Sequence, residues 1–316
     1  SVTGVQTCAL PILITAIIII AFIISVALVV VAIVKYLFTE PKEYEVYKIY
    51  EKIQKISSIG DATVYQCKNK TSNELVAIKE IQLSSSTKKE DIEQEINYMK
   101  LFSDNVNSIK FLDKLEEDDI IFIVIEFCDD NLKKFLDDSE KGFNVEEIQI
   151  VLKQLNNILT NMKDEKIAHN DIKLENIFVK FKNDSKEFDI KLSEYGKATN
   201  LTGITNSTLE KQDLLSLGEI MYEMIFKNKG DSIKDMRNKI GEVEDFDVEL
   251  GDLFSKTLVE NADNRISWDK YFEHVFFNLT DIDYSNVKNI VKKVDIWYNT
   301  NSYRGDNNAW KQTRNN

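Results

Sequence analysis

The sequence predicts an α+β protein in which β-strands gather in the first half and long helices in the second. Residues 53–81 read as short strands separated by polar turns, and residues 120–127 are a run of strongly β-forming residues. Residues 144–162 instead repeat apolar residues at the spacing of a helix face. A continuous apolar run at residues 12–34 precedes both regions, so the predicted fold class includes one transmembrane helix before the α+β domain.

Length and charge limit the possible functions. The chain has 316 residues, enough for one large domain of two lobes or for two smaller domains. It carries 40 Lys and Arg against 53 Asp and Glu, a formal net charge of −13, and no basic patch stands out. Nucleic acid is therefore not an expected partner. The cysteines Cys8, Cys67 and Cys128 are far apart and form no metal-ligand pattern, so we expect a reducing compartment.

The apolar run at residues 12–34 is broken only by Thr15 and Ser25. At about 1.5 Å per residue, a helix of this length crosses a bilayer core of about 30 Å. A secretory signal is the alternative, but its apolar part spans only about 7–15 residues and follows positive charge, which is missing here. Lys35, Lys42 and Lys48 come after the run, so we expect a single-pass membrane protein with the rest of the chain in the cytosol.

The two ends of the chain are less informative. The chain begins with Ser rather than Met, so we expect a fragment, and we expect residues 1–11 to be non-native. Residues 35–52 read as a polar juxtamembrane linker. Residues 278–316 form a polar, Asn-rich extension that we expect to be partly disordered.

Helical spacing is clearest in two stretches. In residues 88–102, Ile92, Ile96 and Met99 share one face. In residues 144–162 the apolar residues keep that spacing throughout, and Asn144 with Glu147 three residues later predicts a capped helix start. We also expect a turn at residues 68–73, a connection at residues 105–113, and a hairpin over residues 178–192.

The polar stretch at residues 167–178 carries the residues best suited to chemistry. Asp171 is a candidate base for a hydroxyl proton, Lys173 can neutralise a phosphate, and Asn176 offers an amide oxygen to a metal ion. The alternative is a polar loop before a strand, without chemistry.

This stretch resembles the catalytic loop of the eukaryotic protein kinases, H-R-D-x-K-x-x-N, and keeps the spacing D-x-K-x-x-N. Residues 76–79 match the kinase motif V-A-I-K, and residues 213–224 resemble the D-x-W-S-L-G helix. The resemblance implies a bilobal fold with a β-rich N-lobe at residues 53–127, a helical C-lobe at residues 128–277, and ATP between them. The D-x-K form is the Ser/Thr type, and Asp171 and Lys173 would be its catalytic residues.

The resemblance also implies a nucleotide and metal site. Lys79 would hold the ATP phosphates with Glu95 as its partner, although Glu93 is a competitor two residues away. Asn176 and Glu194 would hold Mg²⁺. The other expected nucleotide contacts are Gly60, Val64, Ala77 and the backbone groups of Glu126 and Cys128. Ile125 would guard the back of this pocket.

Several positions depart from the kinase pattern. The three positions of the glycine-rich loop hold Ser57, Ile59 and Ala62, with only Gly60 left, out of register. E-Y-G at residues 194–196 replaces D-F-G, and a carboxylate that is longer by one methylene is expected to weaken Mg²⁺ binding. The segment at residues 194–210, called the activation segment below, is short and lacks A-P-E.

Four further residues have expected structural roles. Asn170 replaces the Arg that pairs with a phosphate on the activation segment, which argues against such a switch. The resemblance implies that His169 is structural, that Asp213 anchors the catalytic-loop backbone, and that Arg265 needs a carboxylate partner. Glu210 is the candidate partner.

These observations leave three functional hypotheses. The first is a membrane-anchored Ser/Thr protein kinase that uses ATP and Mg²⁺ on a protein substrate. The second is a pseudokinase that acts as a docking module with weak or no catalysis, which the altered glycine loop and Glu194 favour. The third is a kinase-fold enzyme for small molecules; the missing A-P-E permits it, but the helix at residues 213–224 speaks against it.

Overall fold

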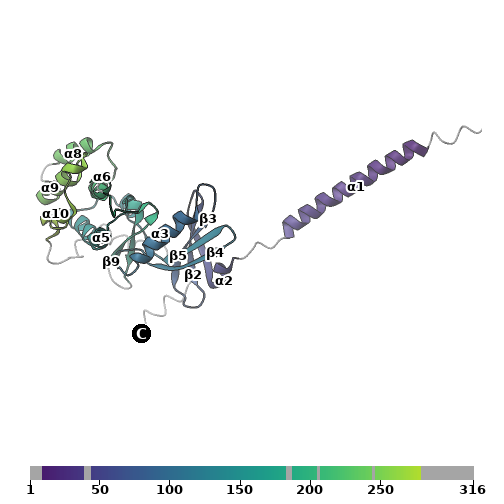
Figure 1. Ribbon diagram of the computed structural model, residues 1–316, viewed down its shortest axis with the longest axis horizontal. Coiled ribbons are helices and arrows are strands. Elements are labelled where there is room, and N and C mark those ends of the chain that lie inside the picture. Colours follow the sequence, from purple (N-terminus) through teal and green to yellow (C-terminus); the bar gives the residue numbers. More distant parts are fainter. Residues whose placement is uncertain (1–8, 39–43, 183–186, 205–206, 244–245, 279–316) are drawn as a thin grey trace, which may run out of the picture. The chain divides into compact units, whose positions relative to one another are not determined.

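The computed structural model describes residues 9–38, 44–182, 187–204, 207–243 and 246–278. Its contacts divide the chain into two compact units, residues 1–48 and residues 49–316. The first unit contains the helix α1 (Ala9–Phe38), and α2 (Glu45–Ile49) begins in it. The second unit contains the remaining helices and all the strands that the structure describes (Figure 1).

Helix α1 is 30 residues long and strongly apolar. Its described side chains, at residue 14, residues 17–31 and residue 33, are exposed. Among the residues that the structure describes, no helix qualifies as a candidate membrane span. The transmembrane helix at residues 12–34 stays a prediction.

The first part of the second unit is an antiparallel sheet of five strands in the order β1-β2-β3-β5-β4. Helix α3 (Lys89–Leu101) follows β3 and buries Ile92, Ile96 and Met99, the face that the sequence predicts. The strands are β1 (Tyr50–Ile59), β2 (Ala62–Asn69), β3 (Leu75–Gln82), β4 (Phe111–Glu117) and β5 (Ile120–Glu126).

Two predictions for this sheet need correction. The expected turn at residues 68–73 begins later, because Lys68 and Asn69 still pair within β2. The expected connection at residues 105–113 runs into β4, which starts at Phe111. Among the described strands it pairs only with β5, and charged residues interrupt the apolar ones in its sequence F-L-D-K-L-E-E, so it lacks the continuous apolar run that marks β5.

The second part of the unit is mainly helical. Two small sheets accompany the helices, with strand orders β6-β8-β9 and β10-β7. The strands are β6 (Asp130–Asn131), β7 (Ile167–Ala168), β8 (Ile177–Phe181), β9 (Phe188–Leu192) and β10 (Thr199–Asn200). The helices are α4 (Leu132–Asp138), α5 (Val145–Asp164), α6 (Ser207–Glu210), α7 (Gln212–Phe226), α8 (Ile233–Gly241), α9 (Val248–Thr257) and α10 (Trp268–Phe272), with short 3₁₀ turns η1 (Leu174–Asn176), η2 (Tyr195–Lys197), η3 (Ala262–Asn264) and η4 (Val275–Phe277).

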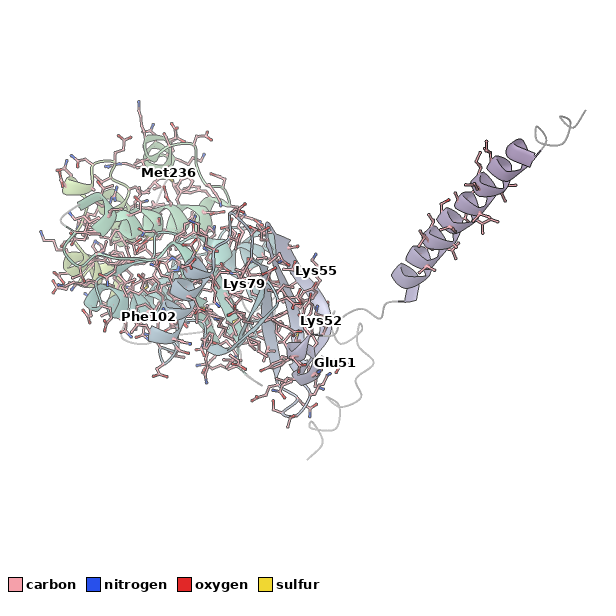
Figure 2. All side chains as sticks on the ribbon, turned by 45° about the vertical axis from the view of Figure 1, so that its right-hand side comes forward. Glu51, Lys52, Lys55, Lys79, Phe102 and Met236 are labelled. Carbon is pink, nitrogen blue, oxygen red and sulfur yellow. The ribbon has the colours of Figure 1, made fainter. Side chains whose placement is uncertain are left out.

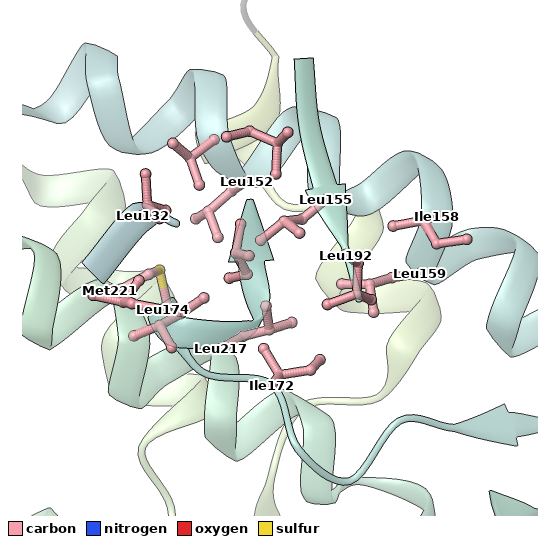
Figure 3. Close-up of a cluster of buried hydrophobic side chains, with 14 of the residues drawn as sticks. Leu132, Leu152, Leu155, Ile158, Leu159, Ile172, Leu174, Leu192, Leu217 and Met221 are labelled. Carbon is pink, nitrogen blue, oxygen red and sulfur yellow. The ribbon is translucent and has the colours of Figure 1, made fainter. Parts of the chain in front are cut away.

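Helix α5 is the centre of this second part. Asn144 caps it, and both hydrogen bonds of the predicted capping box to Glu147 are present. Its apolar face packs with residues of the catalytic loop and α7 around one core (Figure 3). The expected hairpin at residues 178–192 is present as β8 and β9, while its tip at residues 183–186 lies outside the described residues. A β-sheet lobe followed by a helical lobe confirms the predicted bilobal α+β fold.

Candidate active site

Lys79 lies on β3 and is held by two carboxylates. Its Nζ is 2.8 Å from Glu95 Oε1 on α3 and 3.0 Å from Glu194 Oε2. Figure 2 shows Lys79 on the sheet. Burial would lower the pKa of Lys79, but the charges of Glu95 and Glu194 outweigh that effect and raise the pKa, so the side chain stays charged. The alternative partner, Glu93, pairs with Lys114 instead.

Val64 and Ala77 share a sheet face with Lys79. Val64 pairs directly opposite Lys79, and Ala77 is two residues before it on the same strand. Ala77 is buried and Val64 is half-buried. The register therefore places the three predicted contacts side by side.

The hairpin between β1 and β2 differs from a glycine-rich loop. Ser57 and Ile59 lie within β1, Ala62 begins β2, and only Gly60 and Asp61 form the turn. Gly60 has φ +56°, a conformation that favours glycine, so the turn itself explains this residue. Ile59 is 81% exposed at the tip. The Asp61 carboxylate accepts hydrogen bonds from Ser84 Oγ and Thr87 Oγ1, both at 2.7 Å, which ties the tip to the segment after β3.

The segment after β5 contains the expected adenine contacts. The Glu126 backbone N–H already donates to the Lys110 carbonyl at 3.0 Å, so this donor is occupied. Among the described residues, the backbone N–H of Cys128 has no hydrogen-bond partner. The buried Glu126 side chain accepts from Lys180 at 2.5 Å and from Lys191 at 2.9 Å. Of the two residues, only Cys128 keeps its backbone donor free.

Asp171 is the centre of a dense polar cluster. Its Oδ2 accepts from Lys173 Nζ at 3.1 Å and from Asn176 Nδ2 at 2.9 Å. Its Oδ1 accepts from Lys197 Nζ at 2.8 Å. Partial burial would raise the pKa of this carboxyl, but the hydrogen bonds from these three partners outweigh it and lower the pKa. Asp171 is therefore an ionised acceptor, as a base for a hydroxyl proton must be.

The loop that presents Asp171 is anchored from α7. The buried Asp213 carboxylate accepts from the backbone N–H groups of His169 at 2.6 Å and Asn170 at 2.8 Å. The imidazole of His169 is fully buried, with Nε2 3.0 Å from the Ser193 carbonyl. Both residues have the structural positions that the sequence predicts, and they connect the catalytic loop to the strand end that carries Glu194.

Tyr195 of the E-Y-G segment is buried at 1% exposure. Its ring stacks on Phe102 and lies 5.2 Å from the ring of His169. Its hydroxyl is 2.7 Å from Ser108 Oγ, also buried. No motif in the sequence marks Ser108, which lies 87 positions earlier in the chain. A tyrosine can occupy this buried position because its hydroxyl has a hydrogen-bond partner.

Asn176 and Glu194 offer the oxygens that Mg²⁺ prefers. The backbone N–H of Ser193 donates to the Asn176 carbonyl at 3.0 Å, which brings Glu194 next to Asn176. Because Asn176 directs its amide nitrogen to Asp171, its side-chain oxygen is left for a ligand. The two residues fit a magnesium ion that takes its other ligands from phosphate and water. No group of three His, Cys, Asp or Glu side chains suited to a metal occurs among the described residues.

Glu194 has φ +62°, which is unusual for a residue with a side chain. This conformation costs about 1–2 kcal/mol. The strain accompanies the contact of Glu194 with Lys79. Lys79 and a metal ion would therefore compete for the Glu194 carboxylate.

Lys197 is the site residue that sequence analysis missed. It directly follows E-Y-G, and that proximity is the signal that could have marked it. Its ammonium contacts the candidate base, although 65% of the side chain is exposed. The short activation segment thus adds a second lysine beside Asp171.

The expected pair between Arg265 and Glu210 is wrong. Arg265 donates to the backbone carbonyls of Lys211 at 2.7 Å and Val259 at 2.7 Å. The charge of Glu219 acts on Arg265, but burial outweighs it and lowers the pKa of Arg265. Backbone carbonyls satisfy the guanidinium here because the segment around Lys211 folds directly over it.

A β-sheet lobe with an ion-paired lysine, followed by a helical lobe with an Asp-Lys-Asn loop, is the architecture of the bilobal kinase-like proteins. A family model described as the protein kinase domain matches residues 50–277. The chain belongs to the protein kinase family.

Proposed function

We propose that the chain is a Ser/Thr protein kinase, which transfers the γ-phosphate of ATP to a hydroxyl of a protein substrate. One observation carries the proposal: the Asp171 carboxylate is held by both Lys173 and Asn176 within 3.1 Å. A module that only binds ATP needs no such arrangement. Positioning and charge neutralisation are what phosphoryl transfer requires.

Each residue of the site has a role in this proposal. Asp171 accepts the proton of the acceptor hydroxyl and orients it. Lys173 and Lys79 offset phosphate charge, and Glu95 holds Lys79 in place. Asn176 and Glu194 hold Mg²⁺, which when bound neutralises charge on the phosphates. The free backbone donor of Cys128 supports an adenine contact after β5.

A membrane anchor belongs to the same proposal. The apolar run at residues 12–34 and the 30-residue helix α1 support insertion into a bilayer. The lysines that follow it support a cytosolic catalytic domain. Fractionation of cells that express the full chain tests this directly. Extraction by detergent but not by alkaline carbonate supports a transmembrane anchor, and release by carbonate contradicts it.

A pseudokinase is the second candidate function. The observations that favour it are the side chains at Ser57, Ile59 and Ala62, and the ion pair that occupies Glu194 with Lys79. Such a protein would signal by docking, with weak or no catalysis. The two candidates differ in whether magnesium strengthens ATP binding and whether phosphate is transferred.

The test is the thermal stability of the full chain in detergent with ATP, with and without Mg²⁺. At about one hundred times Kd, a ligand stabilises by about 2.7 kcal/mol, which gives a readable shift. The kinase proposal predicts a shift that requires magnesium. A shift that is indifferent to magnesium favours the pseudokinase. No shift with any nucleotide contradicts ATP binding altogether.

The acceptor class needs its own measurement. We expect phosphate on Ser or Thr and not on Tyr when matched peptide mixtures of the three acceptors are supplied with ATP and Mg²⁺. Transfer to tyrosine alone would contradict the Ser/Thr assignment while leaving the kinase proposal in place.

A further inference from the structure

Two successive residues of the catalytic loop hold Lys197 at both of its ends. Asp171 Oδ1 accepts from the Lys197 ammonium at 2.8 Å. Asn170 Nδ2 donates to the Lys197 carbonyl at 3.2 Å, and also to Thr199 Oγ1 at 3.2 Å. The start of the activation segment is thereby fixed to the loop that carries the candidate base.

The backbone on either side strengthens this junction. Thr199 pairs with Ala168 in the β10-β7 ladder, and the Leu201 N–H donates to the Lys166 carbonyl at 2.7 Å. Asn170 has φ +61°, a conformation that asparagine tolerates better than most residues. The junction therefore consists of side-chain and backbone contacts that need no phosphate group.

The hydrogen bonds of Asp171 leave room for a substrate. An ionised carboxylate has about four acceptor positions. Lys173 and Asn176 occupy Oδ2, and Lys197 occupies one position on Oδ1. One position on Oδ1 stays for an acceptor hydroxyl. Lys197 thus restrains the rotation of the Asp171 carboxylate and still leaves one acceptor position for the substrate hydroxyl.

We propose that Lys197 is a positioning residue for Asp171, and that its contacts with Asn170 and Asp171 fasten the activation segment to the catalytic loop without phosphorylation. The inference rests on the proposed function, because it assigns the acceptor hydroxyl to Asp171. Asn170 stands where the kinase pattern has the Arg that pairs with a phosphate, so the chain uses a lysine of its own segment for the same attachment.

The kinetic test compares Lys197→Met, Lys197→Arg and the wild type in the full chain, with ATP, Mg²⁺ and a Ser/Thr peptide mixture. We expect Lys197→Met to lower kcat about tenfold or more, because misplacing a reacting group is costly. KM for ATP should stay within about twofold, since Lys79 is untouched, and Lys197→Arg should restore most of kcat. Lys239→Met is the control, because Lys239 on α8 is a similarly exposed lysine that pairs with Glu242, the residue after that helix. An undiminished kcat in Lys197→Met would overturn the positioning role.

Hydrogen exchange of the same variants separates this inference from the proposed function. We expect Lys197→Met to speed amide exchange in residues 166–171 and 197–201 together, with Lys197→Arg close to wild type. Unchanged exchange in both segments would overturn the fastening, whatever the activity. A wild type that transfers no phosphate would overturn the positioning role along with the proposed function, and faster exchange in Lys197→Met would then still support the fastening.

Discussion

At the scale of single residues, Lys79 is the most constrained charge of the site. It joins β3, α3 and the E-Y-G segment through Glu95 and Glu194. Its side chain is 15% exposed and that of Glu95 is 11% exposed, so water solvates neither charge fully. Removing one partner of such a pair leaves an uncompensated charge.

We therefore expect Lys79→Met to lower the free energy of unfolding by about 3 kcal/mol and to abolish the stabilisation by ATP. Urea unfolding with and without nucleotide measures both effects. Lys114→Met is a matched control, because Lys114 also contacts two glutamates of the N-lobe, Glu93 and Glu116, but lies outside the proposed site. An ATP-dependent shift that survives in Lys79→Met would contradict the role of this lysine.

The hydroxyl pair of Ser108 and Tyr195 is a second residue-scale prediction. Burial raises the pKa of Tyr195, so its hydroxyl stays neutral and can share a hydrogen bond. Ser108→Ala leaves that hydroxyl buried without a partner, and we expect a loss of about 1–3 kcal/mol. The double variant Ser108→Ala with Tyr195→Phe should cost less than the sum of the two single changes. Additive free energies of unfolding would show that the two hydroxyls do not interact.

Glu126 gives a prediction of pH dependence. Burial would raise the pKa of this carboxyl, but Lys180 and Lys191 outweigh burial and hold the pKa below its ordinary value near 4.5. Below about pH 4.5 the unfolded chain therefore binds the proton more readily than the folded chain, so stability falls with falling pH. We expect Glu126→Gln to lose about 3 kcal/mol at pH 7 and to show a shallower fall below pH 4.5. Urea unfolding across pH 3–7 measures this, with the exposed Glu51→Gln as control. Parallel pH profiles for Glu126→Gln and wild type would contradict the ionised pair.

At the scale of elements, helix α5 supports the catalytic loop that follows it. Its start is set by the capping box of Asn144 and Glu147. Asn144→Ala removes the side-chain oxygen that accepts from the Glu147 N–H, and we expect a loss of about 1 kcal/mol in the free energy of unfolding. Asn161→Ala, an exposed asparagine within the same helix, should change stability little. Equal losses in the free energy of unfolding for the two variants would show that the Asn144 cap does not stabilise the protein.

Local patterns were enough to predict some elements and not others. Helix α5, β3 and β5 have clear periodicity, composition or motifs, and the spacing of α3 also places Glu95 rather than Glu93 against Lys79. Strand β4 was missed because charged residues interrupt its apolar ones without the period of two that marks a strand. Pairing with β5 overrides that weak local signal.

Contacts between distant residues were harder to predict. Ser108 and Tyr195 meet only because the fold brings the segment after α3 against the E-Y-G segment. Arg265 takes backbone carbonyls, which a search for a carboxylate partner overlooks. The contact of Lys197 with Asp171 depends on β10 pairing with β7, two strands of only two residues each.

At the scale of the whole molecule, the residues that match the kinase motifs and those that depart from them belong to different parts of the site. The acceptor side keeps Lys173 and Asn176 in contact with Asp171. The nucleotide side has side chains in place of glycines and an engaged Glu194. A protein of this kind is expected to bind ATP less tightly than the kinase pattern implies while keeping the groups that act on the acceptor.

The most direct test of the role of Asp171 is phosphotransfer from ATP to a Ser/Thr peptide mixture by the full chain, compared between wild type, Asp171→Asn and Asp189→Asn. General base catalysis contributes about 10²–10⁴-fold. We expect transfer by wild type and by the control Asp189→Asn, and a loss of at least about 10²-fold in Asp171→Asn, with the thermal shift by ATP retained. Equal transfer by wild type and Asp171→Asn, or no transfer by a folded wild type that binds ATP and Mg²⁺, would contradict this role of Asp171.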